Sequence, residues 1–430
     1  MAIPVTLSAA GKRVGHSPIS DLMARALANP SLISLAAGFV DHGSLPVEAT
    51  ACVTSDMLSE PAEGRRALQY GTTRGDKSLR RQLLAFLERE DGLPRGQFDS
   101  LFDQMIVTTG SQQLLYLIAE ALLDPGDIVL VESPTYFVFL GVLETFGARV
   151  IGIEIDEGGL RVDALEDTLR ELDSRGELGR VKLIYTVSEH SNPTGLSLAA
   201  DRRQKLVEVA RAWSRSHQIF ILEDAAYRGL TYEGTESPSV WSYDQAKDTV
   251  ILARTFSKTF SPGLKCGFGL LPASLSETIH SLKGNHDFGS SHFTQQILGR
   301  VVSEGYYETQ IERLRTIYSR KLKATLDALD EHLGKYGAEV RWTKPRGGLY
   351  VWLGLPAGID TSRNGPFFAQ CLEEGVLYVP GDYAYASEPG PVCRSDARLS
   401  FGVTGEDGIR EGVRRLATAL KTVSARSGLG

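Results

Sequence analysis

The chain has little cysteine, and what it has is widely spaced. Its 430 residues include four cysteines without a CxxC pair or a neighbouring histidine cluster, namely Cys52, Cys266, Cys371 and Cys393. Zinc sites and small disulfide scaffolds both depend on closely grouped cysteines. The spacing therefore argues against either one and predicts the reduced thiols of a cytoplasmic protein.

The chain also lacks long apolar runs. No stretch approaches the roughly 18 uninterrupted apolar residues that mark a membrane-spanning helix. Its first eight residues contain no charged segment followed by an extended apolar core, which a secretory signal requires. We expect a protein that is neither secreted nor membrane-spanning.

Charge of one sign is not concentrated anywhere. The formal net charge is −7, and lysine and arginine are scattered along the chain. Proteins that bind nucleic acid or acidic membranes carry basic patches, so we expect neither partner. A small-molecule ligand is favoured, and no metal is expected.

What is present is ample core-forming material. Hydrophobic residues make up 42% of the chain and charged residues 23%, which is typical of a globular protein and excludes disordered and fibrous classes. Single cores stop growing well below this length. The length therefore predicts one large α/β domain with a smaller companion.

Short apolar runs alternate with helical patterns from about residue 104 to 271, which is typical of a mostly parallel sheet covered on both faces. A helical pattern over residues 114–122 ends at the terminator Asp124-Pro-Gly-Asp127. The expected strands are residues 105–109, 128–132, 181–186, 219–223 and 249–253.

The pattern changes after about residue 300. A charged helical stretch over residues 306–333 precedes expected strands at 340–342, 349–353 and 398–402, which favours a smaller α+β domain. We expect an N-terminal arm over residues 1–45, a large domain over 46–300 and a C-terminal small domain over 301–430.

Several polar residues directly follow the expected strands. Asp224 follows one and Lys258 lies just past another. Ligands of open α/β sheets bind outside the carboxyl ends of the strands, where such residues meet. Taken singly, each has an ordinary alternative, since such an Asp often caps a helix and a loop Lys is usually solvated.

Three further segments stand at the same expected edge. Residues 110–112 place free backbone N–H groups at a helix N-terminus, which is an anion site or a plain Ser cap. Tyr136 follows a rigid Ser-Pro-Thr turn, and Asn192 opens an Asn-Pro-Thr-Gly turn, although either fits a structural role. A lysine, an acid and an anion site together are what pyridoxal phosphate chemistry requires.

The ordered motifs resemble a known family. They are TyrGlyThrThrArgGly (70–75), ThrThrGlySerGlnGln (108–113), SerProThrTyr (133–136), AsnProThrGly (192–195), GluAspAlaAlaTyr (223–227), SerLysThrPheSerProGlyLeuLys (257–265), LysProArgGlyGlyLeuTyrValTrp (344–352) and ArgLeuSerPhe (398–401). This set is similar to the class I/II aminotransferases of fold type I, particularly the branch with 2-aminoadipate and kynurenine aminotransferases. The resemblance covers about residues 15–420 and implies that the large domain binds the cofactor and has a mostly parallel seven-stranded sheet. It also implies that the N-terminal arm contributes to the small domain and the active site.

The resemblance implies roles around pyridoxal 5′-phosphate. Lys258 would form the Schiff base and then serve as general base. Asp224 would hold the proton on the ring nitrogen. Asn192 and Tyr227 would hydrogen-bond the ring hydroxyl oxygen, which favours its anionic form and lowers the pKa of the imine. Tyr136 would stack on the ring.

The resemblance also implies residues for the phosphate and the substrate. The expected phosphate ligands are Ser111, Gln112, Thr255, Ser257, Lys265 and, from the second subunit of a homodimer, Tyr70. Arg398 would bind the substrate α-carboxylate through its planar fork. Gly38 would add a backbone contact, and Asn192 would also face the substrate.

The chain departs from the family pattern at three places. Lys265 stands where the family usually has Arg at the phosphate, which keeps the charge without the fork. The stretch Val187-Ser-Glu-His-Ser191 is unusual, and we expect His190 to be an exposed loop residue rather than a local novelty. Ser20 replaces an arginine that reads a distal carboxylate in the aminoadipate enzymes, and Arg25 is the nearest substitute.

The expected function is transfer of an amino group from an amino acid to a 2-oxo acid by a ping-pong cycle. The same fold and cofactor also serve β-elimination, decarboxylation and amino-acid oxidation, because the reaction depends on which Cα bond is aligned. A ligand-sensing regulator is a remote alternative, since it would need a DNA-binding module. The sequence names neither the amino donor nor the acceptor.

Overall fold

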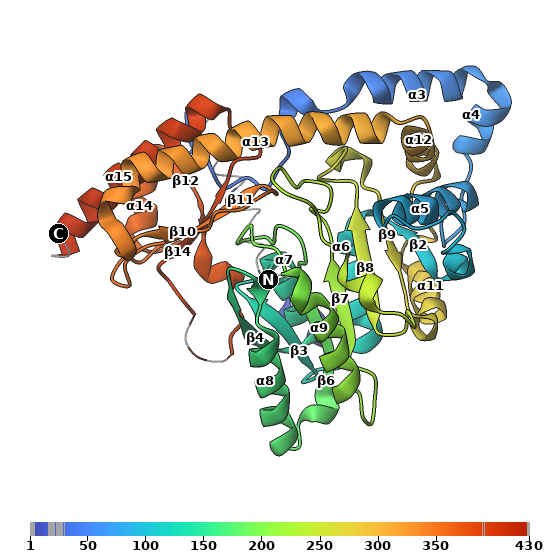
Figure 1. The fold of residues 1–430 in the computed structure, drawn as a ribbon, viewed down its shortest axis with the longest axis horizontal. Coiled ribbons are helices and arrows are strands. Elements are labelled where there is room, and N and C mark those ends of the chain that lie inside the picture. The colour runs from blue at the N-terminus through green and yellow to red at the C-terminus, as the bar shows by residue number, and fades with distance from the viewer. Residues whose placement is uncertain are drawn as a thin grey trace.

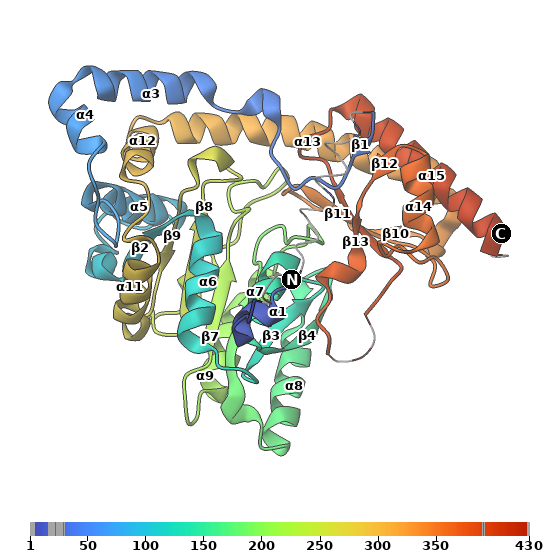
Figure 2. The same cartoon turned by 180° about the vertical axis from the view of Figure 1, so that it is seen from behind.

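An eight-stranded sheet, a four-stranded sheet and a two-stranded sheet, with their helices, make up the described part of the computed structural model (Figure 1). The structure describes residues 5–15, 22, 29, 31–388, 390 and 392–427. The long helix α13 runs along the top of the molecule from above the large sheet to the smaller C-terminal sheet (Figures 1 and 2).

The large sheet is mostly parallel. Its order in the described residues is β2-β9-β8-β7-β6-β3-β4-β5. Neighbours from β8 to β4 pair in parallel, and β9 is antiparallel to both β8 and β2. The strands are β2 (Met105–Thr108), β3 (Ile128–Ser133), β4 (Arg149–Asp156), β5 (Gly159–Leu160), β6 (Val181–Thr186), β7 (Phe220–Asp224), β8 (Val250–Thr255) and β9 (Gly267–Leu270).

Alternate residues of these strands enter two different cores. In β3, Val129 and Val131 pack with α6 and α7, whereas Ile128 and Leu130 pack with the layer of α8 and α9. Successive side chains of a strand point to opposite faces, so a continuous apolar run is what a sheet covered on both sides requires. Figure 1 shows α8 and α9 on one face, and Figure 2 shows α6 and α7 on the other.

The helices start and stop at recognisable residues. Asp76 caps α5 by accepting a hydrogen bond from the Leu79 amide at 2.8 Å, and α7 ends at Gly147 in the left-handed conformation. The α-helices are α1 (Ala9–Arg13), α3 (Val47–Ser59), α4 (Pro61–Ala67), α5 (Lys77–Glu90), α6 (Gly110–Leu122), α7 (Phe137–Phe146), α8 (Val162–Ser174), α9 (Ala200–Trp213), α10 (Val240–Tyr243), α11 (Ala273–Asp287), α12 (His292–Ser303), α13 (Tyr306–Leu333), α14 (Pro366–Glu373) and α15 (Glu406–Ser427). The short 3₁₀ helices are His42–Ser44, Asp99–Gln104, Leu178–Arg180, Pro262–Leu264, Gly334–Glu339 and Gly381–Ala384.

The C-terminal sheet is antiparallel, with the order β10-β11-β14-β13. An N-terminal strand joins this part of the molecule, because β1 pairs in parallel with β12. The strands are β1 (Ile33–Ser34), β10 (Arg341–Trp342), β11 (Tyr350–Gly354), β12 (Val376–Leu377), β13 (Val379–Pro380) and β14 (Asp396–Ser400). The residues that follow β1 also lie close to β14, because the Ser400 amide donates to the Leu35 carbonyl at 2.7 Å.

The expected α/β class and the expected strands are confirmed. The five strands predicted for the large sheet correspond to β2, β3, β6, β7 and β8. Strands β4 and β9 bring the number to the expected seven, and the two-residue strand β5 is an addition at the edge. The helix over residues 306–333 has the predicted bounds. The domain boundaries at 45/46 and 300/301 stay predictions.

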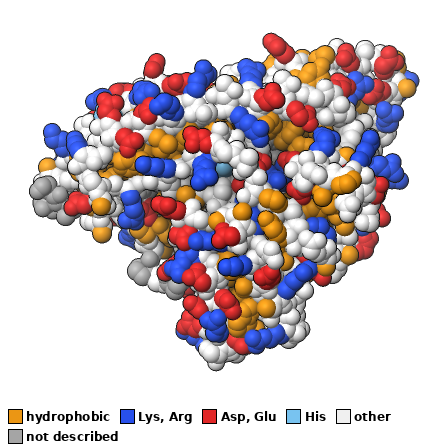
Figure 3. Space-filling view, viewed as in Figure 1, with side chains coloured by type: hydrophobic (Ala, Val, Ile, Leu, Met, Phe, Trp, Pro, Cys, Tyr) orange, Lys and Arg blue, Asp and Glu red, His pale blue; other side chains and the backbone are white. Residues whose placement is uncertain are grey.

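Three general features of the molecule relate to the composition of the chain. Across the described ranges, no helix is long and apolar enough to cross a membrane. Acidic and basic side chains are intermixed on the face shown in Figure 3, in keeping with the scattered charges of the sequence. All four cysteines are free thiols, and Cys266 and Cys371 are buried.

Candidate active site

The predicted site residues of the large sheet meet at one edge. Asp224 ends β7 and Thr255 ends β8, while Asn192 and Tyr136 follow β6 and β3. Because β2 runs in the same direction as β8, the start of α6 at Gly110 lies at this edge as well. The carboxyl ends of parallel strands converge there, as the sequence pattern predicted.

Asp224 is buried and only partly satisfied. Its side chain is 4% exposed, and Oδ2 accepts a hydrogen bond from the Tyr185 hydroxyl at 3.0 Å. Oδ1 has no hydrogen-bond partner among the described residues. Burial raises the pKa of Asp224 to about 6, although the Tyr185 hydroxyl opposes the shift. A buried acceptor without a donor fits a protonated ring nitrogen.

Arg398 is a second buried group with an unused hydrogen-bond donor. It is 1% exposed, and its guanidinium donates to Asn192 Oδ1 at 2.8 Å and to the Ala36 carbonyl at 2.7 Å. Its Nε has no partner, and no carboxylate of the described chain lies within 4.0 Å of the guanidinium. A buried cation that lacks a counter-ion fits a ligand carboxylate.

A pair of tyrosine hydroxyls lies between these groups and Lys258. The Tyr227 and Tyr350 hydroxyls are 3.2 Å apart, and the Tyr350 ring lies 4.4 Å from the Arg398 guanidinium. Burial raises the pKa of Tyr227 well above its ordinary value. Burial also opposes ionisation of Tyr350, but the charges of Lys258 and Arg398 lower its pKa.

Lys258 reaches the N-terminal segment. Its Nζ donates to the Gly38 carbonyl at 2.7 Å. A side chain at position 38 would place Cβ 2.9 Å from the Tyr350 hydroxyl, so only glycine allows this approach. The segment after β1 and the strand edges of the large sheet therefore build one site.

The start of α6 forms a cradle for an anion. Gly110 has the left-handed φ of 71°, and the first turn leaves the amides of Ser111 and Gln112 without intrahelical partners. Opposite, the Thr255 hydroxyl donates to Ser257 Oγ at 2.9 Å. A Cβ at Gly267 would lie 2.8 Å from the Ser111 nitrogen, so β9 approaches the cradle closely. Two hydroxyls and a helix N-terminus fit a phosphate.

Three predicted residues stand at the margins of this arrangement. Lys265 is exposed, with a left-handed φ of 50°, and its ammonium has no partner in the described part of the chain. Tyr136 caps the start of α7, and burial together with the charge of Asp224 raises its pKa. Tyr70 is 83% exposed and its ring meets that of Phe288 edge-on, with centroids 5.8 Å apart.

The prediction for His190 was wrong. The residue is 3% exposed, because its ring packs against Gly347 and Gly348 and its Nε2 lies 2.8 Å from the Thr231 hydroxyl. The sequence reveals only the loop position, whereas the covering segment is more than 150 residues away. Ser20 and Arg25 lie outside the described residues.

Two residues of the site were not assigned from the sequence. Tyr350 stands inside the LysProArgGlyGlyLeuTyrValTrp motif, so the motif could have pointed to it. Tyr185 lies within the apolar run of β6, and only its pairing with Asp224 distinguishes it from a core residue. Register between strands decides that contact, and the sequence does not fix register over such a distance.

Comparison with known proteins identifies the family. A family model described as aminotransferase class I and II matches residues 30–416. The chain belongs to this family. Its fold is that of the fold type I aminotransferases, its cofactor is pyridoxal 5′-phosphate, and it catalyses amino-group transfer.

Three similar proteins illustrate the relationship. The aromatic-amino-acid aminotransferase 1 of Thermococcus litoralis is 34% identical over 390 residues, which cover 91% of this chain and 88% of that protein. The Pyrococcus horikoshii kynurenine aminotransferase, solved with PMP, is 32% identical with a TM-score of 0.87, and 97% of each chain is covered. The Thermus thermophilus α-aminoadipate aminotransferase, solved with N-(5′-phosphopyridoxyl)-L-leucine, is 30% identical with a TM-score of 0.83, and 98% of each chain is covered.

The raised pKa of Asp224 predicts a pH-dependent stability of this aminotransferase without its cofactor. The folded carboxyl holds its proton up to about pH 6, whereas the unfolded one is already ionised at pH 5, so stability falls as the pH rises from 5 to 8. Asn cannot ionise, so the Asp224→Asn variant lacks this pH-dependent loss of stability. Its free energy of unfolding relative to that of the wild type should therefore rise by about 1.4 kcal/mol between pH 5 and pH 8. Urea unfolding of the cofactor-free proteins measures it.

Asp156→Asn provides the control for that measurement. Arg202 lowers the pKa of Asp156, so this carboxylate is ionised in both folded and unfolded chains above pH 5. Its stability difference from wild type should not change between pH 5 and 8. A difference for Asp224→Asn that is equally flat would contradict the assigned pKa.

Proposed function

We propose that this aminotransferase takes its amino group from an aromatic or medium-sized apolar amino acid and passes it to a 2-oxo acid in a ping-pong cycle. The observation that carries the proposal is the buried Arg398 guanidinium, which has an unpaired Nε and no carboxylate partner among the described residues. Such a group pairs best with a planar carboxylate. Every amino acid and 2-oxo acid offers one.

The cofactor is held by groups of the sheet edge. When bound, pyridoxal 5′-phosphate supplies an aldehyde that takes up the amino group and a ring that withdraws electrons from the substrate Cα. Asp224 would accept a hydrogen bond from the protonated ring nitrogen, for which its unpaired Oδ1 is available. Asn192 and Tyr227 would donate to the ring oxygen, and Tyr136 would cover the ring.

The phosphate would lie at the start of α6. The amides of Ser111 and Gln112 and the hydroxyls of Thr255 and Ser257 are the proposed donors. Lys265 would add a positive charge from the surface, since a lysine acts there as a point charge rather than a fork.

Lys258 would hold the cofactor covalently and then move the proton at the substrate Cα. Its Nζ lies 2.7 Å from the Gly38 carbonyl, which orients it between the N-terminal segment and the tyrosine pair. Release from the cofactor would free the amine for this task. Gly38 and Asn192 would complete the contacts around the substrate carboxylate that Arg398 binds.

The active unit is proposed to be a cytoplasmic homodimer. Tyr70 is 83% exposed and Phe288 64%, so two adjacent aromatic rings face outward from one chain. Exposed apolar groups of this kind mark association surfaces. Tyr70 would reach the phosphate of the second subunit.

Lys258 should carry the cofactor. Borohydride reduction of the yellow holoenzyme should abolish its visible absorption band and fix the cofactor on this lysine, because reduction makes the linkage irreversible. Peptide mass spectrometry locates the adduct. An adduct on Lys265, the other lysine of the same motif, would refute the assignment.

Tyr70 should act across the subunit interface. Tyr70→Phe and Lys258→Ala homodimers each carry a defect in both sites, whereas a hybrid dimer has one site with neither defect if the residues come from different chains. Mixing the variants under subunit exchange should then restore activity to about one quarter of wild type, since half the dimers are hybrids with one intact site. Exchange demonstrated by mass spectrometry without recovered activity would exclude this arrangement.

Substrate choice should favour apolar donors. The position that would read a distal carboxylate holds Ser20, and burying an unpaired carboxylate costs several kcal/mol. Phenylalanine or leucine should therefore exceed 2-aminoadipate in kcat/KM, and Ser20→Arg should narrow the difference. The name of the Thermococcus litoralis relative supports an aromatic donor.

The same assay separates the alternatives. Dependence of turnover on a 2-oxo acid distinguishes amino-group transfer from β-elimination, decarboxylation or oxidation by the same cofactor. A wild-type preference for 2-aminoadipate of about tenfold, or 1.4 kcal/mol, would show that the pocket holds another cation.

A further inference from the structure

His190 is buried next to the candidate active site. It stands in the turn that follows β6 and carries Asn192 two residues later. The backbone of His190 has a left-handed φ of 46°, which is unusual for a residue other than glycine and is held here by its contacts.

The partners of His190 determine which of its ring nitrogens donates a hydrogen bond and which accepts one. The Thr231 hydroxyl donates to Glu236 Oε1 at 2.9 Å, so Thr231 Oγ1 accepts from the His190 Nε2–H at 2.8 Å. His190 Nδ1 is then the acceptor for the Ser197 hydroxyl at 3.3 Å, while the His190 amide donates to Ser197 Oγ at 2.9 Å. Both ring nitrogens and the backbone are thereby engaged.

The ring also fills the space over a glycine pair. A Cβ at Gly347 would lie 2.4 Å from His190 Nε2, and one at Gly348 would lie 2.6 Å from His190 Cβ. Gly347 forms an antiparallel bridge with Thr231, and the Gly348 amide donates to the Leu230 carbonyl at 3.0 Å. His190 therefore packs across the pairing of the loop after β7 with the segment before β11.

The same three segments carry site residues. Asn192 belongs to the turn of His190, Tyr227 precedes Leu230 on the loop after β7, and Tyr350 begins β11 just after Gly348. Tyr227 and Tyr350 share the 3.2 Å hydroxyl contact, and Asn192 accepts from Arg398. One imidazole thus contacts the Thr231 hydroxyl and the glycine pair, and its own turn leads to Asn192.

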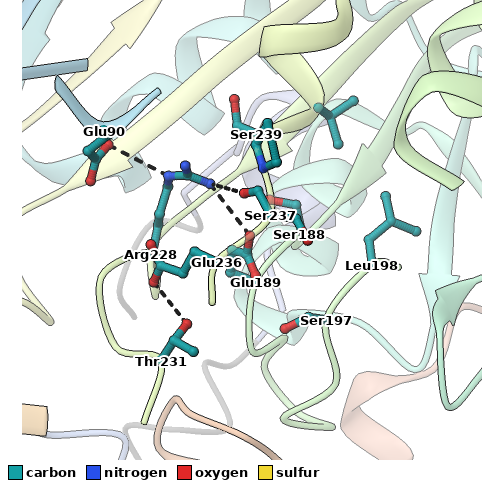
Figure 4. A network of polar contacts seen from close by, with 12 residues as sticks. Glu90, Ser188, Glu189, Ser197, Leu198, Arg228, Thr231, Glu236, Ser237 and Ser239 are labelled. Atoms are coloured by element: carbon teal, nitrogen blue, oxygen red, sulfur yellow. Dashed lines mark hydrogen bonds and ion pairs between the residues drawn. The ribbon is translucent and has the colours of Figure 1, made fainter. Parts of the chain in front are cut away.

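Ion pairs restrain the other side of the turn. Glu189 lies 2.9 Å from Arg203 and 3.5 Å from Arg228, and Arg228 also donates to the Ser237 carbonyl (Figure 4). Figure 4 shows Arg228 bridging Glu90 and Glu189, with the Glu236–Thr231 bond alongside. A cavity of about 960 Å³, lined in part by His190, Trp342 and Lys344, adjoins the turn. The turn borders this cavity, and the ion pairs and hydrogen bonds named above hold it on that side.

We propose that His190 is a positioning residue, which acts through Thr231 and the glycine pair to place Asn192 and the Tyr227–Tyr350 hydroxyls against the cofactor ring oxygen. The inference rests on the proposed roles of Asn192 and Tyr227. It assigns no contact between His190 and the cofactor or the substrate.

Two variants with side chains of similar length test the hydrogen bond from His190 to Thr231. His190→Gln keeps an N–H donor, whereas His190→Met does not. Loss of hydrogen bonds to the anionic ring oxygen should raise the midpoint of the cofactor's absorbance pH titration, by about half a unit for His190→Met, and leave it near wild type for His190→Gln. We expect kcat/KM for phenylalanine to fall about tenfold in His190→Met, because small misplacements of catalytic groups are costly.

Matched variants separate positioning from stability. Thr231→Val removes the partner of Nε2 and should shift the midpoint in the same direction as His190→Met. The His217 Nε2–H donates to the Val181 carbonyl at 2.6 Å, at the opposite end of β6. His217→Ala should therefore lower the melting temperature without moving the midpoint.

Different results would contradict the role of His190 and the proposed function. Equal midpoints for His190→Gln and His190→Met, or a His190→Met variant that loses only melting temperature, would overturn the proposal. If His190→Met does not fold, an unchanged midpoint in Thr231→Val would overturn it instead. A wild-type protein without a titrating cofactor band would refute the proposed function rather than this inference.

Discussion

The buried guanidinium of Arg398 is the interaction on which the site depends. It joins the N-terminal segment through the Ala36 carbonyl, the large sheet through Asn192 and the C-terminal sheet through its own strand β14. These parts are distant in sequence, and each contributes a group that faces Lys258 or the tyrosine pair. A buried cation without a counter-ion is costly, so Arg398 fits the binding of an anionic ligand better than a purely structural role.

Asp224 is a second buried group whose unmet hydrogen bonding lowers the stability of the protein without its ligands. Its Oδ1 is buried without a donor, and burial raises its pKa toward neutrality. The two groups have opposite charge and are held in place by Tyr185 and Asn192 before any ligand arrives. Preorganised polar groups lower the stability of the protein without its ligands, but they need not reorganise during the reaction. Binding of the cofactor and substrate is therefore expected to stabilise the fold.

The sequence predicted what is local or periodic. Continuous apolar runs identified the central strands, and the rule that ligands bind at carboxyl ends brought Asp224, Lys258 and Asn192 to one edge. Strand β9 was not predicted, because Gly267-Phe-Gly-Leu270 is short and glycine-rich and becomes a strand only between β2 and β8. Tyr185, Tyr350 and the burial of His190 depend on register and on contacts across more than 30 residues, about which local pattern carries no information.

The two departures from the family pattern near the site differ in what they require of the surrounding chain. Lys265 is exposed, so its replacement of an arginine demands no change in its neighbours. His190 is buried, and a buried imidazole needs a donor, an acceptor and space. Ser197, Thr231 and the Gly347–Gly348 pair supply these in turn. A substitution at position 190 therefore acts on three segments at once, and each of them ends at a residue that faces the cofactor site.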